Sequence, residues 1–394
     1  MRLLLWVFSL AHFVSLVSAE GDCIHTWCDT CLPVTIHDAP GVGFDLTPLY
    51  GTAVVHYYNG TVVEVAKIQG SPEYLELMAR LATSKPSPQP TLNFMREIPI
   101  PSRLLEYLFP SRSSPWRDWW RWLNMKIGRP IKADDVEIIS DLLQELKIAT
   151  EKTIFQPLDR VAVTEPGFQS LDAETTNAAL RILGLRTWVR DSVYYASRLV
   201  EGDAVYAANG YGLCTNYEDR FQCSDEFEDS SVPTVFVVSY NHNLLYTSIM
   251  DLTSGEAFPH SSSLEAQLVD YELGLDSLLE NDRGRTVLLD RLRSQLQILP
   301  RESKYTVTHI FLAGESVTHP HFLATLRDSM SELSLDSATA KIQLAIDPTF
   351  AAARGAALYA RRRQEVPSEC YERGECEEMR MHERLRTSTR EELR

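Results

Sequence analysis

The chain has 394 residues, of which 44% are hydrophobic and 23% are charged, and its formal net charge at pH 7 is −16. This composition is typical of a folded protein with a sizeable core rather than of a disordered chain. The excess of acidic residues argues against binding nucleic acid or an anionic membrane by bulk electrostatic attraction, because both of those surfaces are themselves negative.

The first 19 residues predict a cleaved signal peptide. Arg2 precedes an apolar run from Leu3 to Val17, and the small residues Ser18 and Ala19 follow it, which is the order found at secretory cleavage sites. The run is short for a membrane-spanning helix, although an uncleaved anchor is the alternative interpretation. We therefore expect a protein of the secretory pathway, either in the lumen of the endoplasmic reticulum or secreted.

Seven cysteines in an oxidising compartment predict disulfides and one odd thiol. The candidates are Cys23, Cys28, Cys31, Cys214, Cys223, Cys370 and Cys376. Cys214 and Cys223 bracket an acidic segment and are expected to pair, and Cys370 and Cys376 are spaced to close a small loop. The three N-terminal cysteines, together with His25, also match zinc-ligand and thioredoxin-type spacings, but disulfides suit the compartment better.

The mature chain alternates between strand and helix patterns. Strands are expected at 42–45, 53–58, 62–67, 160–164, 186–189, 234–240, 244–251, 309–313 and 342–345. Helices are expected at 72–82, 133–155, 172–183, 193–199, 264–279, 286–299, 320–330 and 350–363. A meander of strands opens each half, so the pattern indicates an internal duplication.

The duplication, together with the family resemblance given below, implies the domain organisation. We expect a first lobe at 20–205 with a small subdomain at 71–152, a Cys-bracketed acidic loop at 206–230, a second lobe at 231–347, a closing helix of the first lobe at 348–363 and a charged tail at 364–394.

The stretch from Val42 to Val55 is the most informative part of the sequence. It has the layout of a hairpin that cradles phosphate: a strand ending in Asp45-Leu46, a turn and a second strand. Such turns use glycine and hydroxyl residues so that backbone N–H groups approach the phosphate closely. Here the turn is Thr47-Pro48-Leu49, in which proline has no N–H and leucine has no hydroxyl.

Four motifs, in order along the chain, resemble those of the actin, sugar-kinase and heat-shock-chaperone ATPase superfamily. They are Gly43-Phe44-Asp45-Leu46, the strand and helix from Val161 to Gly184, the segment Ile310 to Ser316 with its Gly314, and the segment Asp347 to Ala357. The closest likeness is to the ATPase domain of the seventy-kilodalton heat-shock chaperones, and uncharacterised secreted fungal proteins share the pattern. The resemblance implies an α/β fold of two actin-like lobes, each a ribonuclease H-like unit.

Departures from that family imply a pseudo-enzyme. The second phosphate loop of the family falls on residues 239–244, which contain no glycine, and Asp191-Ser192-Val193 stands where the family has its catalytic Glu before Pro-Thr. Only Asp45, Asp191 and Gly314 remain as candidate neighbours of a nucleotide. Because phosphoryl transfer depends on positioning and charge neutralisation, we expect no cofactor, with residual binding of ATP and magnesium as the alternative.

Ser316 offers a second kind of chemistry. The segment Gly314 to Thr318 resembles the nucleophile elbow of α/β-hydrolases, with His319 or His321 as a base, but Thr318 stands where the elbow needs glycine. A plain loop between strand and helix is the favoured interpretation. An enzyme that uses the cleft near Asp45, Asp191 and Ser316 for relocated chemistry is the alternative function.

Two further features concern modification and partners. Asn59-Gly60-Thr61 is a glycosylation sequon in a predicted turn. Trp116, Trp119 and Trp120 share one helical face within a tryptophan-rich segment at 113–123, which either is buried in the subdomain or contacts a partner or membrane interface. We expect a protein partner, for example a membrane-bound enzyme of the secretory pathway or a fungal biosynthetic complex, and no nucleic acid.

Overall fold

The computed structural model describes residues 39–84, 132–168, 170–188, 191–192, 195–196, 199–215, 217, 226, 233–252, 262–280, 284–333, 341–343, 346–365, 375–376, 378–379 and 381–382. Residues Pro40–Arg362 form one compact unit, and the account below concerns that unit. The predicted signal peptide, the tryptophan-rich segment and all the cysteines except Cys214 and Cys376 lie outside the described residues.

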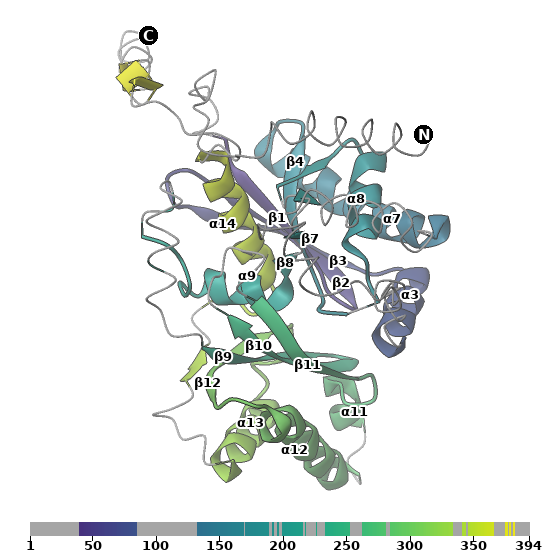
Figure 1. Ribbon diagram of the computed structural model, residues 1–394. Helices are drawn as coiled ribbons and strands as arrows, with labels where there is room; N and C mark the ends of the chain where they lie inside the picture. The colour runs from purple at the N-terminus through teal and green to yellow at the C-terminus, as the bar shows by residue number, and fades with distance from the viewer. Residues whose placement is uncertain are drawn as a thin grey trace, which may run out of the picture. The chain divides into compact units, whose positions relative to one another are not determined.

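The protein is a mixed α/β structure that contains two mixed sheets (Figure 1). The first sheet has the strand order β3-β2-β1-β4-β5, and β8 also pairs with β4. Strands β1, β2 and β3 form an antiparallel meander, whereas β4 runs parallel to β1 and β5 runs parallel to β4. The bounds are β1 Gly41–Leu46, β2 Tyr50–His56, β3 Val62–Gln69, β4 Arg160–Glu165, β5 Arg186–Thr187 and β8 Leu199–Val200.

The second sheet repeats this plan in the order β11-β10-β9-β12-β13. Its meander is antiparallel, and β12 and β13 continue the sheet in parallel from β9. The bounds are β9 Thr234–Asn241, β10 Leu244–Leu252, β11 Ser262–Asp270, β12 Val307–Ala313 and β13 Lys341–Gln343. The predicted duplication of the meander is therefore confirmed at the level of sheet topology.

Each sheet is covered by amphipathic helices. On the first sheet, α7 (Ala133–Ile154) packs against β2 and β3, and α3 (Pro72–Thr83) and α8 (Ala173–Ile182) pack against α7. On the second sheet, α12 (Arg285–Glu302) contacts β10, β11 and α13 (Pro320–Glu332), and the short α11 (Leu275–Glu280) contacts α12. No helix in the described part of the chain is long and apolar enough to cross a membrane.

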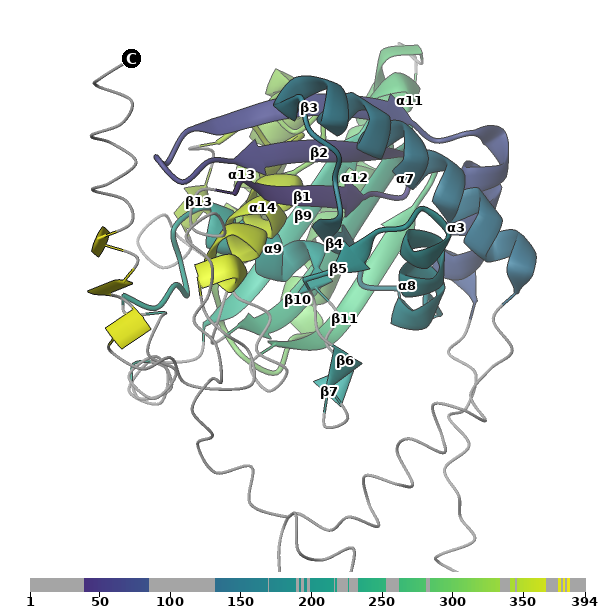
Figure 2. The ribbon, with the colours of Figure 1, turned by 90° about the horizontal axis from the view of Figure 1, so that it is seen from above.

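Two helices join the sheets (Figures 1 and 2). Helix α9 (Glu201–Ala208) contacts β4 and β8 of the first sheet and β10 and β12 of the second. Helix α14 (Ala351–Glu365) lies so close to β1 that a Cβ added at Gly43 would be 2.2 Å from the carbonyl oxygen of Ala353. The backbones of β1 and α14 can approach this closely because Gly43, Ala353 and Ala357 have small side chains or none. The joint is a buried apolar cluster made from both sheets, α9 and α14.

Three sequence predictions are wrong in this region and in the second meander. The helix expected at 193–199 is replaced by two-residue strands, β6 Asp191–Ser192, β7 Tyr195–Ala196 and β8, and helix α9 was not predicted. The helix expected at 264–279 is the edge strand β11 followed by α11. Leu, Glu and Gln favour a helix locally, but pairing with β10 along the whole of β11 overrides that preference.

Candidate functional site

The turn between β1 and β2 bonds to itself. The hydroxyl of Thr47 accepts the backbone N–H groups of Leu49 (3.2 Å) and Tyr50 (2.9 Å), and the N–H of Thr47 donates to the carbonyl of Tyr50 (2.9 Å). The carbonyl of Thr47 accepts the hydroxyl of Tyr74 at 2.7 Å. Because Pro48 has no N–H, every N–H of this turn is already used within it, so the turn offers none to a phosphate.

Asp45 lies at the end of β1, as the sequence predicts, and only 2% of its surface is exposed. Its Oδ1 accepts a 2.7 Å hydrogen bond from the hydroxyl of Thr164 on β4. Burial raises the pKa of Asp45 to about 7, and the hydrogen bond from Thr164 opposes that rise. The carboxyl group therefore keeps its proton to a higher pH than a solvent-exposed aspartic acid does.

Glu201 is a site residue that the sequence reasoning missed. It begins α9 directly after β8, is 3% exposed, and faces the charge of Asp45. Burial raises the pKa of Glu201 to about 8, the negative charge of Asp45 adds to the rise, and a hydrogen bond from Ser239 on β9 lowers it. A signal existed in the sequence: two acidic residues, Glu201 and Asp203, precede a run of small and apolar residues, which is typical of a helix N-terminus.

In the second sheet, the turn between β9 and β10 corresponds to the turn at Thr47 in the first sheet. Asn241, the last residue of β9, fills this turn. Its Oδ1 accepts hydrogen bonds from the hydroxyl of Tyr50 (3.1 Å) and from the N–H of Glu315 (3.2 Å), and its Nδ2 donates to Ser239 (3.3 Å). The side chain is fully buried. It therefore connects the turn of the first sheet directly to the loop after β12, through the space between the two sheets.

The loop between β12 and α13 completes this junction. Gly314 has a φ of +94° and lies against the backbone of Tyr240, a conformation and an approach that favour glycine. The next residue, Glu315, forms an ion pair with Lys67 of β3, whose ammonium lies 4.6 Å from the ring centre of Tyr50. The N–H of Ser316 donates to the carbonyl of Tyr240 at 3.0 Å.

Ser316 does not form a nucleophile–base pair with the described histidines. Its hydroxyl is buried and has no hydrogen-bond partner in the described part of the protein, and the Nδ1 of His319 is likewise buried without one there. Ser316 belongs to a loop between a strand and a helix, as the plainer interpretation of the sequence predicts. The hydrolase hypothesis gains no geometric support.

The structure thus brings together Asp45, Gly314 and Ser316 and adds Thr47, Tyr50, Glu201 and Asn241. We call this group the inter-sheet site. Asp191 is not assigned to it: its backbone pairs with Ala196 in the β6–β7 hairpin, and its side chain lies outside the part of the structure that is described. Among the described residues, no group of three or more His, Cys, Asp or Glu side chains is arranged to hold a metal ion.

The remaining candidates lie apart from this site. Asn59 is exposed in the turn between β2 and β3, where its Oδ1 accepts the N–H of Thr61 at 2.9 Å. Cys214 and Cys376 are buried, and the expected cysteine pairings stay predictions. Trp116, Trp119 and Trp120 lie outside the described residues.

The fold and the site define a class by structure: an α/β protein with a duplicated mixed sheet and a closed, acidic inter-sheet site. No protein-family model matches the chain, and no curated protein matches it significantly.

Proposed function

We propose that the protein is a non-catalytic relative of the actin-like and heat-shock-chaperone ATPases that serves as a protein-binding scaffold in the secretory pathway. Support for the fold comes from the two sheets, which share one strand order and one pattern of strand directions. Support for the secretory setting comes from the N-terminal sequence and from the exposed sequon at Asn59. Within this proposal, Glu201 is a better counterpart of the family's catalytic Glu than Asp191.

The loss of catalysis rests on the self-bonded turn at Thr47. A phosphate-binding turn must present unpaired N–H groups, whereas here the N–H groups of Thr47, Leu49 and Tyr50 are all used internally. Tyr50 and Asn241 are fully buried and bonded to each other, which supports a closed junction between the two sheets. A nucleotide would have to break these bonds before it gained any of its own.

We expect no change in thermal stability when millimolar Mg-ATP or Mg-ADP is added to the mature, oxidised protein. A ligand that binds only the folded state at 100 times its dissociation constant adds about 2.7 kcal/mol, which for a chain of this size raises the melting temperature by roughly 3 °C. Differential scanning fluorimetry with and without nucleotide makes the comparison, with magnesium alone as the control. A reproducible rise of that size would contradict the proposal.

An enzyme with relocated chemistry is the second candidate, and one observation favours it. Asp45 and Glu201 form a buried pair of carboxyl groups whose pKa values are raised to about 7 and about 8, and such perturbed groups cluster at catalytic sites. Their burial argues against it, because Asp45 and Glu201 are at most 3% exposed. A nucleotide-induced stabilisation in the experiment above would move this candidate to the front.

If the protein is a scaffold, its binding to a partner protein is expected to depend on the tryptophan-rich segment. Changing Trp119 and Trp120 together to alanine is expected to reduce recovery of the partner at least tenfold, because exposed tryptophans carry a large share of interface energy. The measurement is quantitative co-purification of the tagged protein from its native secretory extract. Trp122→Ala is the matched control, since helical spacing would place Trp122 off the face that is predicted for Trp116, Trp119 and Trp120. Undiminished recovery with the double variant would remove the interface role of these residues.

A further inference from the structure

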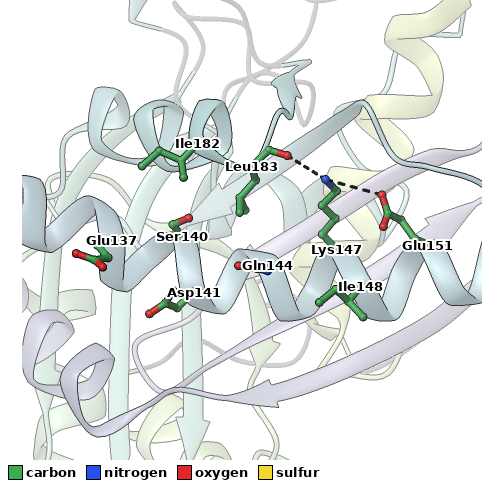
Figure 3. Close-up of a pocket in the computed structure, with 9 residues that line it drawn as sticks. All are labelled: Glu137, Ser140, Asp141, Gln144, Lys147, Ile148, Glu151, Ile182 and Leu183. Atoms are coloured by element: carbon green, nitrogen blue, oxygen red, sulfur yellow. Dashed lines mark hydrogen bonds and ion pairs between the residues drawn. The ribbon is translucent and has the colours of Figure 1, made fainter.

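The groove between α7 and the end of α8 is lined by exposed apolar side chains from both helices and by acidic side chains of α7 (Figure 3). Its volume is about 480 Å³. It is lined by Glu137, Ser140, Asp141, Gln144, Lys147, Ile148, Glu151, Ile182 and Leu183. We call it the α7–α8 groove. It is separate from the inter-sheet site, with which it shares no residue.

Two isoleucines are exposed in this groove. Ile148 on α7 is 56% exposed and Ile182 on α8 is 65% exposed, and Figure 3 shows them on opposite sides of the groove. A single exposed isoleucine needs no explanation, but two that line the same depression provide apolar area that a partner can bury. The groove therefore offers an apolar contact from each of the two helices that line it.

The charges around the groove are largely uncompensated. Helix α7 contains six acidic and two basic residues, and the side chains of Glu137 and Asp141 make no hydrogen bond or ion pair in the described part of the protein. The one basic residue in the lining, Lys147, already donates to the carbonyl of Leu183 at 2.9 Å and lies 3.9 Å from Glu151. An occupant must therefore bring positive charge to the end marked by Glu137 and Asp141.

The shape of the groove favours a helix over a compact molecule. Glu137, Asp141, Gln144, Ile148 and Glu151 recur every three or four residues, so they form one face of α7. The fifteen residues from Glu137 to Glu151 span roughly 21 Å of helix, about four turns of a partner helix lying alongside. Small-molecule sites are usually more apolar and more enclosed than a lining with this many charges.

We propose that the α7–α8 groove binds a basic amphipathic helix of a partner protein, with apolar anchors against Ile148 and Ile182 and Lys or Arg side chains facing Glu137 and Asp141. Helices commonly dock in this way, with residues three and four apart as anchors. This inference rests on the proposed scaffold function and names the chemistry of the partner. It adds a second contact surface to the tryptophan-rich segment.

The direct test uses a synthetic 18-residue Lys/Leu amphipathic peptide and the full mature chain. Fluorescence anisotropy is expected to detect binding that weakens as NaCl rises from 50 to 500 mM, because exposed charges are screened by salt. A Glu/Leu peptide of the same pattern should not bind. Equal binding of the two peptides, or no binding of the Lys/Leu peptide at 50 mM NaCl, would overturn the proposal.

Variants locate the binding on the protein. The double variant Ile148→Asp/Ile182→Asp removes the apolar anchors. The double variant Glu137→Lys/Asp141→Lys reverses the charge at the acidic end of the groove. Each double variant should weaken peptide binding at least tenfold. The matched controls are Val287→Asp and Glu302→Lys on α12, at positions that are likewise exposed. Melting temperatures within about 2 °C of the parent verify folding, as expected for exposed positions. If controls and groove variants lose binding equally, the peptide senses only the net charge and the proposal fails.

The chain's own residues 85–131 are a competing occupant, since they include eight Lys or Arg and three Asp or Glu residues. Intramolecular crosslinks between Lys126 and Lys152, together with absence of peptide binding, would assign the groove to that segment and overturn the proposal. The outcomes also separate the two inferences. If the groove variants still bind the native partner but Trp119→Ala/Trp120→Ala does not, the scaffold function is supported. The proposal that the groove binds the partner is then refuted.

Discussion

Gly355→Ala is expected to lower the free energy of unfolding by more than about 3 kcal/mol, the upper range for overpacking in a rigid interior. Gly355 lies in α14, where alanine ordinarily stabilises a helix by roughly 1 kcal/mol relative to glycine. Here the added Cβ would be 1.9 Å from the carbonyl oxygen of Ala204 in α9 and 2.5 Å from its carbonyl carbon. Both are backbone atoms, so no side-chain rotation relieves the clash and the two helices must separate.

The measurement is urea unfolding, with Gly184→Ala as the control. Gly184 ends α8 with a φ of +69° and has no atom within 4 Å of its added Cβ, so that substitution costs only the backbone strain, about 1 kcal/mol. The two variants therefore separate crowding at the α9–α14 crossing from the general cost of replacing glycine. A Gly355→Ala protein as stable as the parent would show that α9 and α14 do not meet as described.

The prediction at Gly355 concerns the part of the fold that was hardest to infer from sequence. The meanders were accessible because alternating or continuous apolar runs and turn residues are local signals: β1, β2, β9 and β10 all lie where expected. Helix α14 was also expected. What the local pattern did not reveal is that Gly355 meets the backbone of Ala204, because residues 151 positions apart in the chain leave no local trace of their contact.

The inter-sheet site was predicted only in part, because contacts between residues that are distant in the chain leave no local pattern in the sequence. Asp45 and Gly314 could be predicted as site residues because each lies at the end of a strand that the sequence indicates. The sequence does not single out Glu201, because the match to the family's catalytic Glu falls on Asp191 and because helix α9, which begins at Glu201, is not predicted. The role of Asn241 depends on hydrogen bonds to Tyr50 and Glu315, which come from different sheets or loops. The sequence showed that the phosphate turns were altered, and the structure adds how the altered residues bond to one another.

The inter-sheet site should make stability depend on pH in an unusual direction. The folded-state pKa of Asp45 is raised from 3.8 to about 7, and that of Glu201 from 4.5 to about 8, mainly by burial. A raised carboxyl pKa means that the folded state holds its proton more tightly than the unfolded state. The stabilisation is therefore fully present below about pH 4 and is lost as pH rises through about 7 to 8.

Asp45→Asn isolates this contribution. The amide keeps an oxygen that accepts the Thr164 hydroxyl, as Asp45 does now, but it carries no charge at any pH. Relative to the parent, we expect the variant to gain about 1.4 kcal/mol per pH unit between pH 5 and pH 7. Its melting temperature should thus exceed that of the parent by several degrees at pH 8, although the difference is small or reversed at pH 5.

Thermal unfolding of both proteins from pH 5 to 8.5 checks this, with Glu302→Gln on the exposed end of α12 as the control. Glu201→Gln should act in the same direction, and the double variant should gain less than the sum, because removing either charge also relieves its partner. A constant difference between Asp45→Asn and the parent across this range would mean that Asp45 is ionised in the folded protein. The acidic pair would then require a bound cation or an open, hydrated site, and the closed scaffold would no longer describe this protein.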